Sequence, residues 1–254
     1  MKEKTYAVIT GDVIGSTQMS KTGSATWMEY LKDSLIYVGN NYKIAFSVVR
    51  GDSFQGLTEQ PGSALKDAVV LRLKLISSFE ESLKQPRLDA RVAIGLGKVE
   101  SSPDKSSRIG EMGGEAFEYS GILLDSLKQI AGYPEYLKRS IPARILQKGR
   151  VSLAIGSPWQ DLNDEMNIYC LMIDRLISKW TKKECAAVMY RIQGYQLSEI
   201  GDKLGIGTSA VARRLEKTDY DLVELIIQRY SRVIKSKMDS IEEPSMDDRF
   251  EREA

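Results

Sequence analysis

The stretch of sequence that most constrains the fold is residues 184–217, ECAAVMYRIQGYQLSEIGDKLGIGTSAVARRLEK, in which glycines separate three helix-forming segments. The first segment favours a helix that ends at Gly194. Residues 198–204 predict a short second helix that ends at Gly205, because glycine accepts the positive φ of a helix terminus. A third helix follows directly. This spacing predicts a helix-turn-helix.

The third helix has an apolar side and a basic side. Val211 and Leu215 lie four residues apart and can pack inward together. The other faces carry small residues first and cations later, which suits a helix that enters the major groove of DNA. The DNA-contacting residues that we expect are Thr208, Ser209, Ala210, Arg213, Arg214 and Lys217. The alternative is an ordinary helical core with a solvated, charged outer face.

The same run resembles the C-terminal DNA-binding region of bacterial sigma factors and many response-regulator helix-turn-helix units. The residues that carry the resemblance are Gly194, Tyr195, Glu199, Ile200, Gly201, Leu204, Gly205, Ile206, Val211, Arg214 and Leu215. Gly201 stands where alanine is usual, and we expect it to loosen the second helix slightly. The resemblance implies double-stranded DNA as a partner.

Composition limits the remaining possibilities. The chain has 254 residues, of which 42% are hydrophobic, and this is comfortable for two soluble globular domains. The sequence contains no histidine, which removes histidine-based catalysis and metal ligation. Cys170 and Cys185 lack a metal-binding spacing, so we expect two core residues in a reduced, cytoplasmic protein. No apolar run is long enough for a membrane span.

Charge is unevenly placed along the chain. Residues 180–238 contain eleven Lys or Arg against seven Asp or Glu, whereas residues 239–254 contain seven acids against two Arg. The basic part coincides with the predicted helix-turn-helix, and an acidic, disordered tail is expected after it. The expected division is a first domain over 1–158, a connector helix over 159–180, a helix-turn-helix domain over 181–238 and a tail over 239–254.

The amino-terminal part alternates strands and helices. The expected strands are residues 6–9, 44–49, 53–57, 88–97 and 151–155, and the expected helices are residues 27–38, 61–84 and 115–131. The order of these elements is that of the split βαβ, ferredoxin-like fold. The fold class is therefore α+β, with an all-α domain following a ferredoxin-like one.

Two carboxylates stand out on that plan. Asp12 follows the first strand, and Asp52 lies in the hairpin between the next two. Because the first and third strands of such a sheet are neighbours, both aspartates can meet and hold Mg²⁺ or Mn²⁺. The residues that we expect at a phosphate or nucleotide group are Val13, Gly15, Ser16, Thr17 and Arg50. The alternative is that these are turn residues, and that Arg50 is a surface charge.

A resemblance favours the first alternative. Residues 11–17, GDVIGST, resemble the opening motif of class III nucleotidyl cyclase catalytic domains, and Gly51-Asp52 resembles their second metal site. The chain as a whole is similar to the SatD family of bacterial proteins, through residues 6–16, GDSF at 51–54 and GEAF at 114–117. This resemblance implies a cyclase-like domain joined to a helix-turn-helix, and dimerisation.

Three positions depart from the cyclase pattern. Val48 replaces a lysine that reads the base, and Glu118 and Ile122 replace an asparagine and an arginine that bind ribose and stabilise the transition state. Loss of the arginine removes a cation aimed at developing phosphate charge. The pattern therefore favours nucleotide binding over efficient cyclisation, and whether the protein is an enzyme stays open.

Two further helices are expected to be amphipathic. Residues 163–180 form a connector whose apolar stripe packs on a domain or forms a dimer seam. That stripe consists of Met166, Tyr169, Cys170, Ile173, Leu176 and Ile177. Residues 219–237 form the last helix, whose apolar face covers the helix-turn-helix core or pairs with the same helix of a second copy. That face consists of Leu222, Leu225, Ile226 and Tyr230. We expect a homodimer, since helix-turn-helix proteins usually bind paired half-sites.

Three functions remain in view at this point. The favoured one is a DNA-binding transcriptional regulator whose cyclase-like domain senses a nucleotide or metal. The second is a metal-dependent nucleotidyl cyclase or related phosphoryl-transfer enzyme with a regulatory helix-turn-helix. The third is a pair of protein-interaction modules, in which case the basic helix makes no specific contribution to DNA affinity.

Overall fold

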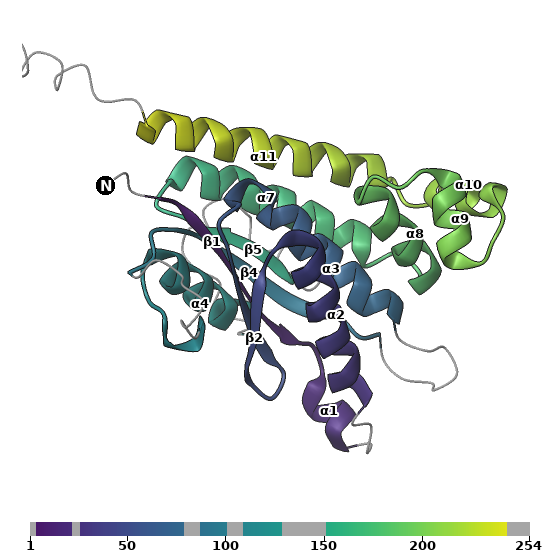
Figure 1. The fold of residues 1–254 in the computed structure, drawn as a ribbon, viewed down its shortest axis with the longest axis horizontal. Coiled ribbons are helices and arrows are strands. Elements are labelled where there is room, and N and C mark those ends of the chain that lie inside the picture. Colours follow the sequence, from purple (N-terminus) through teal and green to yellow (C-terminus); the bar gives the residue numbers. More distant parts are fainter. Residues whose placement is uncertain (1–3, 22–25, 79–86, 101–108, 129–150, 243–254) are drawn as a thin grey trace, which may run out of the picture.

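The computed structural model describes residues 4–21, 26–78, 87–100, 109–128 and 151–242 (Figure 1). The strands are β1 (Tyr6–Val13), β2 (Ala45–Arg50), β3 (Ser53–Thr58), β4 (Ala90–Gly97) and β5 (Leu153–Gly156). The helices of the first half are α1 (Ser16–Lys21), α2 (Thr26–Tyr42), α3 (Ala64–Ser78) and α4 (Glu115–Lys128), with 3-10 turns η1 (Pro61–Ser63) and η3 (Ile109–Glu111). The helices of the second half are α7 (Gln160–Ile177), α8 (Lys182–Ile192), α9 (Leu197–Leu204), α10 (Thr208–Leu215) and α11 (Tyr220–Glu242).

The strands form one mixed sheet with the order β2-β3-β1-β4-β5. β1 pairs antiparallel with both β3 and β4, and β2 pairs antiparallel with β3. β5 is added in parallel beside β4. The first four strands therefore have the split βαβ arrangement, and the predicted ferredoxin-like plan is confirmed.

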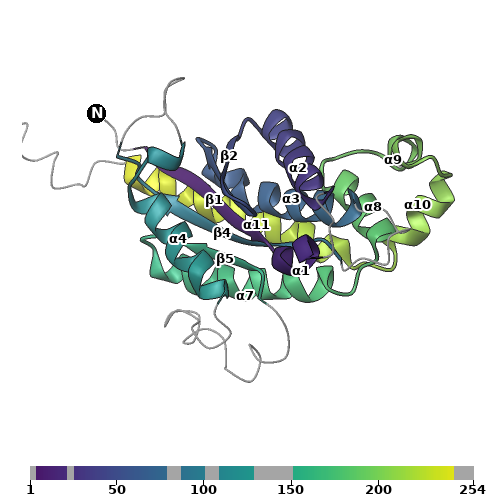
Figure 2. The same ribbon diagram turned by 90° about the horizontal axis from the view of Figure 1, so that it is seen from below.

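Successive side chains of β1 point to opposite faces of the sheet, and helices cover both faces. Ala7 and Ile9 belong to the main core, which they share with α2, α3 and α7, whereas Tyr6 and Val8 pack with Phe117 of α4. The ribbon shows α2 and α3 on one side of the sheet and α4 on the other (Figure 2). Residues 10 and 12 consequently face the same layer as α4.

β1 is longer than the sequence predicts. We expected it to end at Ile9, but it continues to Val13, and it pairs on both sides from Ala7 to Asp12. Gly11 does not break the strand because it makes room for an aromatic ring: a Cβ there would lie 2.3 Å from Cζ of Phe54. Asp12 is therefore a strand residue whose position is fixed by two neighbouring strands.

The connector helix α7 packs against the sheet domain. Met166, Cys170, Ile173 and Ile177 are completely buried in the same core cluster as the inner residues of β1 and β4. The apolar stripe predicted from the sequence therefore packs on the sheet domain of the same chain. Of the two predicted roles, packing on a domain and forming a dimer seam, the structure shows the first. The buried Cys170 and Cys185 are core residues, as expected.

The last helix buries only part of the apolar face predicted for it. Leu222 and Leu225 are 46% and 57% exposed, whereas Ile226 and Tyr230 are buried. The buried residues of α11 are Val223, Ile226, Tyr230 and Ile234. The helix runs along α7 (Figure 1), and the hydroxyl of Tyr230 donates to the carbonyl of Pro61 at 2.9 Å. This contact orients the buried face toward η1.

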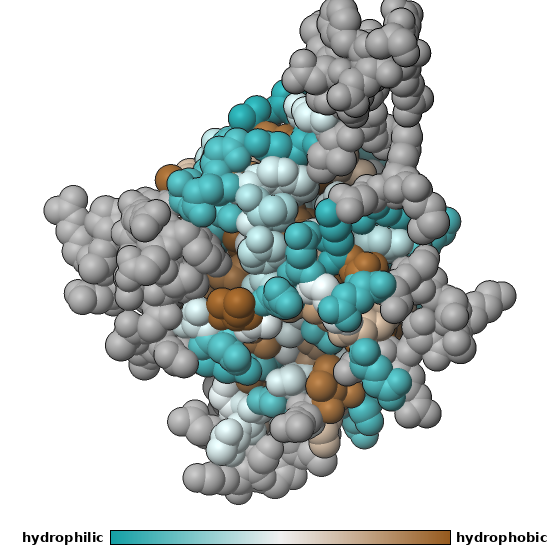
Figure 3. Space-filling model, turned by 90° about the vertical axis from the view of Figure 1, so that its left-hand side faces the viewer, coloured by the Kyte–Doolittle hydropathy of each residue, from teal (hydrophilic) through white to brown (hydrophobic). Residues whose placement is uncertain are grey.

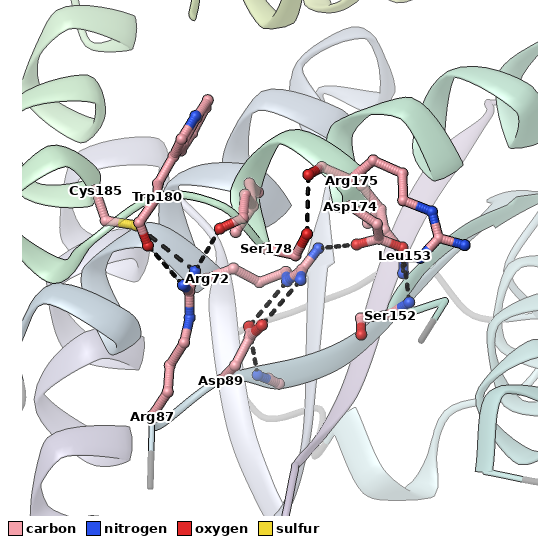
Figure 4. Close-up of polar contacts among 12 residues, drawn as sticks. Arg72, Arg87, Asp89, Ser152, Leu153, Asp174, Arg175, Ser178, Trp180 and Cys185 are labelled. Carbon is pink, nitrogen blue, oxygen red and sulfur yellow. Dashed lines mark hydrogen bonds and ion pairs between the residues drawn. The ribbon is translucent and has the colours of Figure 1, made fainter. Parts of the chain in front are cut away.

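A buried ion network joins α3, the start of β4 and α7 (Figure 4). Arg72 of α3 donates through Nε and Nη2 to the two carboxylate oxygens of Asp89, both at 3.0 Å, and through Nη1 to Asp174 of α7. Asp174 also accepts from the backbone N–H groups of Ser152 and Leu153. Removing one member of such a network leaves a buried charge uncompensated.

The segment before β4 also reaches the end of α7. The two terminal nitrogens of Arg87 donate to the carbonyls of Trp180 and Ile177, each at 2.7 Å (Figure 4). The carbonyl of Ile177 also accepts from the N–H of Trp180 at 3.2 Å. Both carbonyls lie at the C-terminal end of α7, where a cation is favourable. The junction between α7 and α8 is therefore tied to the sheet.

The surface at the end of the molecule farthest from α8–α10 mixes small apolar patches with polar side chains (Figure 3). Within the described ranges, no helix combines the length and apolarity that crossing a bilayer demands. Most of the predicted acidic tail lies outside the described residues, although α11 extends to Glu242.

Candidate functional site

The end of β1 and the β2–β3 hairpin meet at one edge of the sheet. Asp12 lies directly opposite Ser53 in the antiparallel register, one residue from Asp52. The N–H of Val13 donates to the carbonyl of Asp52 at 3.2 Å. The structure thus brings Asp12 and Asp52 together, although forty residues separate them in the chain. Gly51, with φ of 51°, makes the hairpin turn between β2 and β3.

Asp12 is buried and incompletely hydrogen-bonded. The residue is 7% exposed, and its Oδ2 accepts from Nη1 of Arg91 at 3.1 Å. Within the described part of the chain, Oδ1 is buried and accepts no hydrogen bond. Burial raises the pKa of Asp12 above its ordinary value; Arg91 and Lys128 oppose the rise, and the Asp52 carboxylate adds to it. The charge of Asp52 affects the pKa of Asp12 because the two carboxylates are close to each other.

Asp52 is held by the residue that begins α1. The hydroxyl of Ser16 donates to Oδ2 of Asp52. Gly15, which precedes it, has a φ of 78° and is exposed, as is Thr17. The segment predicted to contact phosphate therefore lies beside the aspartate pair, and its role there stays a prediction.

Val13 does not fit the role predicted for it. Its side chain is 1% exposed and belongs to the main core, on the opposite face of β1 from Asp12. Its N–H is already used by the carbonyl of Asp52. We therefore remove Val13 from the phosphate-binding residues. Arg50 lies at the end of β2, paired with Ser53, and its side chain is outside the described set.

Sequence reasoning missed Arg91 and the polar residues next to it. Arg91 lies directly opposite Asp12 on β4. Thr10, two residues before Asp12, donates to the Ser120 hydroxyl of α4 at 2.9 Å and accepts from Gln55 at 3.2 Å. Alternate residues of β1 share one face, so Thr10 and Asp12 lie together, and the register of β1 with β4 places Arg91 opposite Asp12. Finding these residues from the sequence would therefore require the order of the strands in the sheet.

The aspartate pair fits a hard divalent cation in part. Carboxylate oxygens are suitable ligands, and the unpaired Oδ1 of Asp12 is a buried acceptor that a cation would satisfy. The described residues contain no cluster of three or more His, Cys, Asp or Glu with metal-binding geometry. The remaining ligands would have to be water or phosphate oxygens, as is usual for Mg²⁺.

A second candidate surface is formed by α8, α9 and α10. Capping boxes begin α8, with Thr181 and Glu184, and α9, with Gln196 and Glu199. Gly205 ends α9 in the left-handed conformation, with φ of 63°. These features fix three successive helices at the positions that the glycine spacing predicts, and the turn between α9 and α10 is short.

The backbone of this turn packs closely against Gly201. A Cβ at position 201 would lie 2.7 Å from the carbonyl oxygen of Ile206, and the N–H of Ile206 donates to the carbonyl of Gly201 at 3.0 Å. The backbone of the turn approaches α9 too closely for alanine. The loosening expected from helix propensity stays a prediction, but the contact with the following turn leaves no room for alanine.

α10 presents the exposed residues expected of it. Val211 and Leu215 are buried, whereas Thr208, Ser209, Arg213 and Lys217 are exposed and Ala210 and Arg214 are half-buried. A shallow hollow of about 260 Å³ is lined by Glu184, Ala210, Arg213, Arg214 and Lys217. The helix thus offers small residues at its start and cations toward its end. DNA binding by these residues stays a prediction.

No protein-family model and no curated protein matches this chain. Among solved structures, it is similar to the guanylyl cyclase domain of the RhoGC fusion protein from Blastocladiella emersonii, with 15% identity, 49% of this chain and 74% of that chain covered, and a TM-score of 0.39. It is also similar to the guanylate cyclase domain of RhGC from Catenaria anguillulae in complex with GTP, with 14% identity, 49% and 74% coverage, and a TM-score of 0.40. Similarities at this level say nothing about the chemistry of this chain.

Proposed function

We propose that this protein is a nucleotide-responsive DNA-binding protein, in which Asp12 and Asp52 bind a divalent cation together with the phosphates of a nucleotide. The observation that carries the proposal is the convergence of the two carboxylates, with Oδ1 of Asp12 buried and unpaired within the described residues. An unsatisfied buried acceptor costs about 1–3 kcal/mol. A bound cation offsets that cost directly.

Each residue at this edge has a distinct role in the proposal. Asp12 supplies a rigid ligand, since two neighbouring strands fix its backbone. Asp52 lies on the hairpin, and its hydrogen bond from Ser16 orients the carboxylate. The bound cation would neutralise phosphate charge beside these carboxylates, which otherwise repel a nucleotide.

Duplex DNA is the proposed partner of α10. Its exposed cations, Arg213 and Lys217, are suited to phosphates or guanine edges, and the small residues at its start allow close approach to the groove. The alternative, a helical core whose charged outer face is only solvated, also explains the charges on α10. It does not explain the tight turn at Gly201, which fixes α10 against α9.

A continuous set of contacts is available to couple the two surfaces. The N–H of Ile14 donates to the carbonyl of Asp89 at 2.8 Å. The Asp89 carboxylate binds Arg72, which in turn binds Asp174 of α7, and Arg87 binds the end of α7. A cation at Asp12 that displaced this segment would act on the base of the α8–α10 unit. Coupling requires that the ligand prefer one arrangement.

Calorimetry with Mn²⁺ and nucleoside triphosphates tests the proposed ligand. Wild type should bind at least one Mn²⁺–triphosphate complex, and Asp12→Asn should bind it at least tenfold more weakly, a difference of about 1.4 kcal/mol or more. Asp33→Asn on the exposed face of α2 is the matched control and should bind like wild type. Absence of binding by wild type to ATP, GTP, CTP and UTP contradicts the nucleotide proposal.

The second candidate function is metal-dependent phosphoryl transfer, including nucleotide cyclisation. The same aspartate pair favours it, because paired carboxylates that hold metal ions serve this chemistry widely. The residues at the cyclase transition-state positions are unfavourable: Glu118 is exposed, and Ile122 is 62% exposed and carries no charge. Incubation with the four triphosphates and Mn²⁺, followed by a search for cyclic or hydrolysed products, separates this candidate from simple binding.

A further inference from the structure

The outward sides of α7 and α11 form one face of the molecule, and two ion pairs fix how the helices align. Nζ of Lys237 lies 2.6 Å from Oδ2 of Asp161. Nε of Arg229 lies 2.9 Å from Oε1 of Glu165. The later residue of α11 thus pairs with the earlier residue of α7, so the two helices are antiparallel. Both pairs lie toward the start of α7, away from the α8–α10 unit.

Toward the α8–α10 unit, the same face becomes apolar. The next outward residues lie at spacings of three, four or seven from the ion pairs, which keep them on the same side of each helix. They are Ile168 and Met172 on α7 and Leu225 and Leu222 on α11, and they are 42%, 44%, 57% and 46% exposed. Because the helices are antiparallel, all four lie at one level. Exposed apolar side chains gathered in this way mark an interaction surface.

Charge is divided along α11 in a way that matches a second copy of the same helix. Residues 219–224 contain three acids and no base, whereas residues 229–237 contain four bases and no acid. Asp221 and Arg229 are both exposed, four positions before and four positions after Leu225, so they share its face. Two antiparallel copies centred on Leu225 would therefore place opposite charges level with each other. Parallel copies would place like charges together.

The helix dipole accounts for part of this pattern. Acids near the start of a helix and bases near its end are favourable within a single helix. The dipole gives no reason, however, for Leu222 and Leu225 to be exposed beside the exposed apolar residues of α7. The apolar patch and the divided charge together fit a self-complementary contact, which is what a two-fold dimer requires of one surface.

We infer that two copies of this chain associate through the α7–α11 face, with their α11 helices antiparallel and crossing at Leu225. The contact removes from water the four apolar side chains of each copy, which is the favourable contribution. The opposite charges on either side of Leu225 fix the direction of the two helices. The inference depends on neither the proposed cation site nor the proposed binding of DNA.

This arrangement has a consequence for both proposed sites. α11 begins at Tyr220, five residues from Leu225, or about 7.5 Å along the helix axis. The two α8–α10 units would thus lie on either side of the two-fold axis, as paired half-sites require. α1, which follows Asp12 in the chain, lies on the opposite side of the molecule from α11 (Figure 1). Each copy therefore keeps its own aspartate pair outside the contact.

Analytical ultracentrifugation of the full chain measures the association. Wild type should be a dimer, and Leu225→Asp should raise its dissociation constant by about tenfold or more, because the two new carboxylates face each other at the crossing point. Ile36→Asp is the matched control, since Ile36 lies on α2 and is 59% exposed. It should dimerise like wild type.

Cysteine cross-linking tests the crossing point itself. Leu225→Cys should give a disulfide-linked dimer under mild oxidation, because the same residue of the second copy lies opposite it. The natural Cys170 and Cys185 are buried and should not react. Ile36→Cys is the control and should stay unlinked on a non-reducing gel. Both variants replace exposed side chains, so the core is unchanged.

Three results would overturn the inference. Wild type that stays monomeric up to about 100 μM has no such contact of useful strength. Leu225→Asp that dimerises as strongly as wild type shows that the copies meet through another face. A dimer that Leu225→Asp dissociates, but that Leu225→Cys does not cross-link, contradicts the antiparallel crossing at Leu225.

Discussion

The indole Nε1 of Trp180 donates a hydrogen bond to the backbone carbonyl of Thr218 at 2.8 Å. Trp180 follows α7 and is 3% exposed, while Thr218 lies between α10 and α11 and is 1% exposed. The contact therefore closes the helical unit α8–α10 at its base, where Arg87 also binds the carbonyl of Trp180. One side chain links the two ends of the proposed DNA-binding unit to the rest of the protein.

Replacement of this indole should weaken the whole fold. Trp180→Phe keeps an aromatic ring but leaves the carbonyl of Thr218 buried and unpaired, which should lower the free energy of unfolding by about 1–3 kcal/mol. Urea denaturation followed by circular dichroism measures it. Trp159→Phe is the matched control, since Trp159 is only half-buried; equal losses in the two variants contradict a specific role for the Trp180 hydrogen bond.

Gly201→Ala should be destabilising although alanine is the better helix former. The added Cβ would meet the Ile206 carbonyl oxygen at 2.7 Å, so the turn before α10 must shift. Gly121→Ala in α4 is the matched control, because a Cβ added there would have no neighbouring atom within 4 Å. It should gain about 0.5–1 kcal/mol from helix propensity. Thermal unfolding of both variants checks the opposite signs, and a stabilised Gly201→Ala would contradict the close approach.

Asp67 should make stability depend on pH. Its carboxylate in α3 is completely buried, and burial raises its pKa to about 6, opposed by the hydrogen bond from Ser63 and the charge of Lys66. Because the folded pKa is raised, the folded state binds the proton more tightly. The resulting stability is present below the ordinary carboxyl pKa and is lost as pH rises from about 4 to about 6, by about 3 kcal/mol.

The variant Asp67→Asn should remove that dependence. It lacks the charge that is costly to bury, so it should be more stable than wild type at pH 7.5 and similar to it at pH 4. Urea midpoints at both pH values give the comparison. A wild type that is the more stable protein at pH 7.5 would show that the ionised carboxylate has a favourable partner in the fold.

The proposed DNA contacts predict a charge-specific loss of affinity. Arg213→Ala/Lys217→Ala removes two exposed cations of α10, and it should weaken binding to duplex DNA and reduce the salt slope by about 2. Arg232→Ala/Lys235→Ala on α11 removes the same charge elsewhere and is the control. Fluorescence anisotropy across a series of salt concentrations measures both. Equal losses in the two variants would favour nonspecific attraction over a recognition helix.

The sequence predicts the sheet well because the strands and the hairpin are determined by residues close together in the chain. The apolar alternation and the turn at Gly51 fix the strands and the hairpin, and the order of elements then fixes the ferredoxin-like topology. Where prediction failed, a contact with another segment decided the outcome. β1 continues beyond Ile9, where Phe54 of β3 covers Gly11, and Gly201 is required by the carbonyl of Ile206 in the turn after α9.

The candidate site was predictable only in part, for the same reason. Asp12 and Asp52 are recognisable because each follows or joins a strand, and the topology brings them together. Arg91 faces Asp12 only through the register of β1 with β4, which no spacing in the sequence reports. On α11, Leu222 and Ile226 share a plausible stripe, yet only the packing against neighbouring elements decides that Leu222 is exposed.

The most direct test of the cation site is anomalous diffraction from crystals grown with Mn²⁺ and a nucleoside triphosphate. The account predicts a manganese peak within coordination distance of both carboxylates, Asp12 and Asp52, with phosphate oxygens completing its shell. Density for the nucleotide elsewhere on the protein, or a manganese-free edge at saturating concentrations of both ligands, would contradict it.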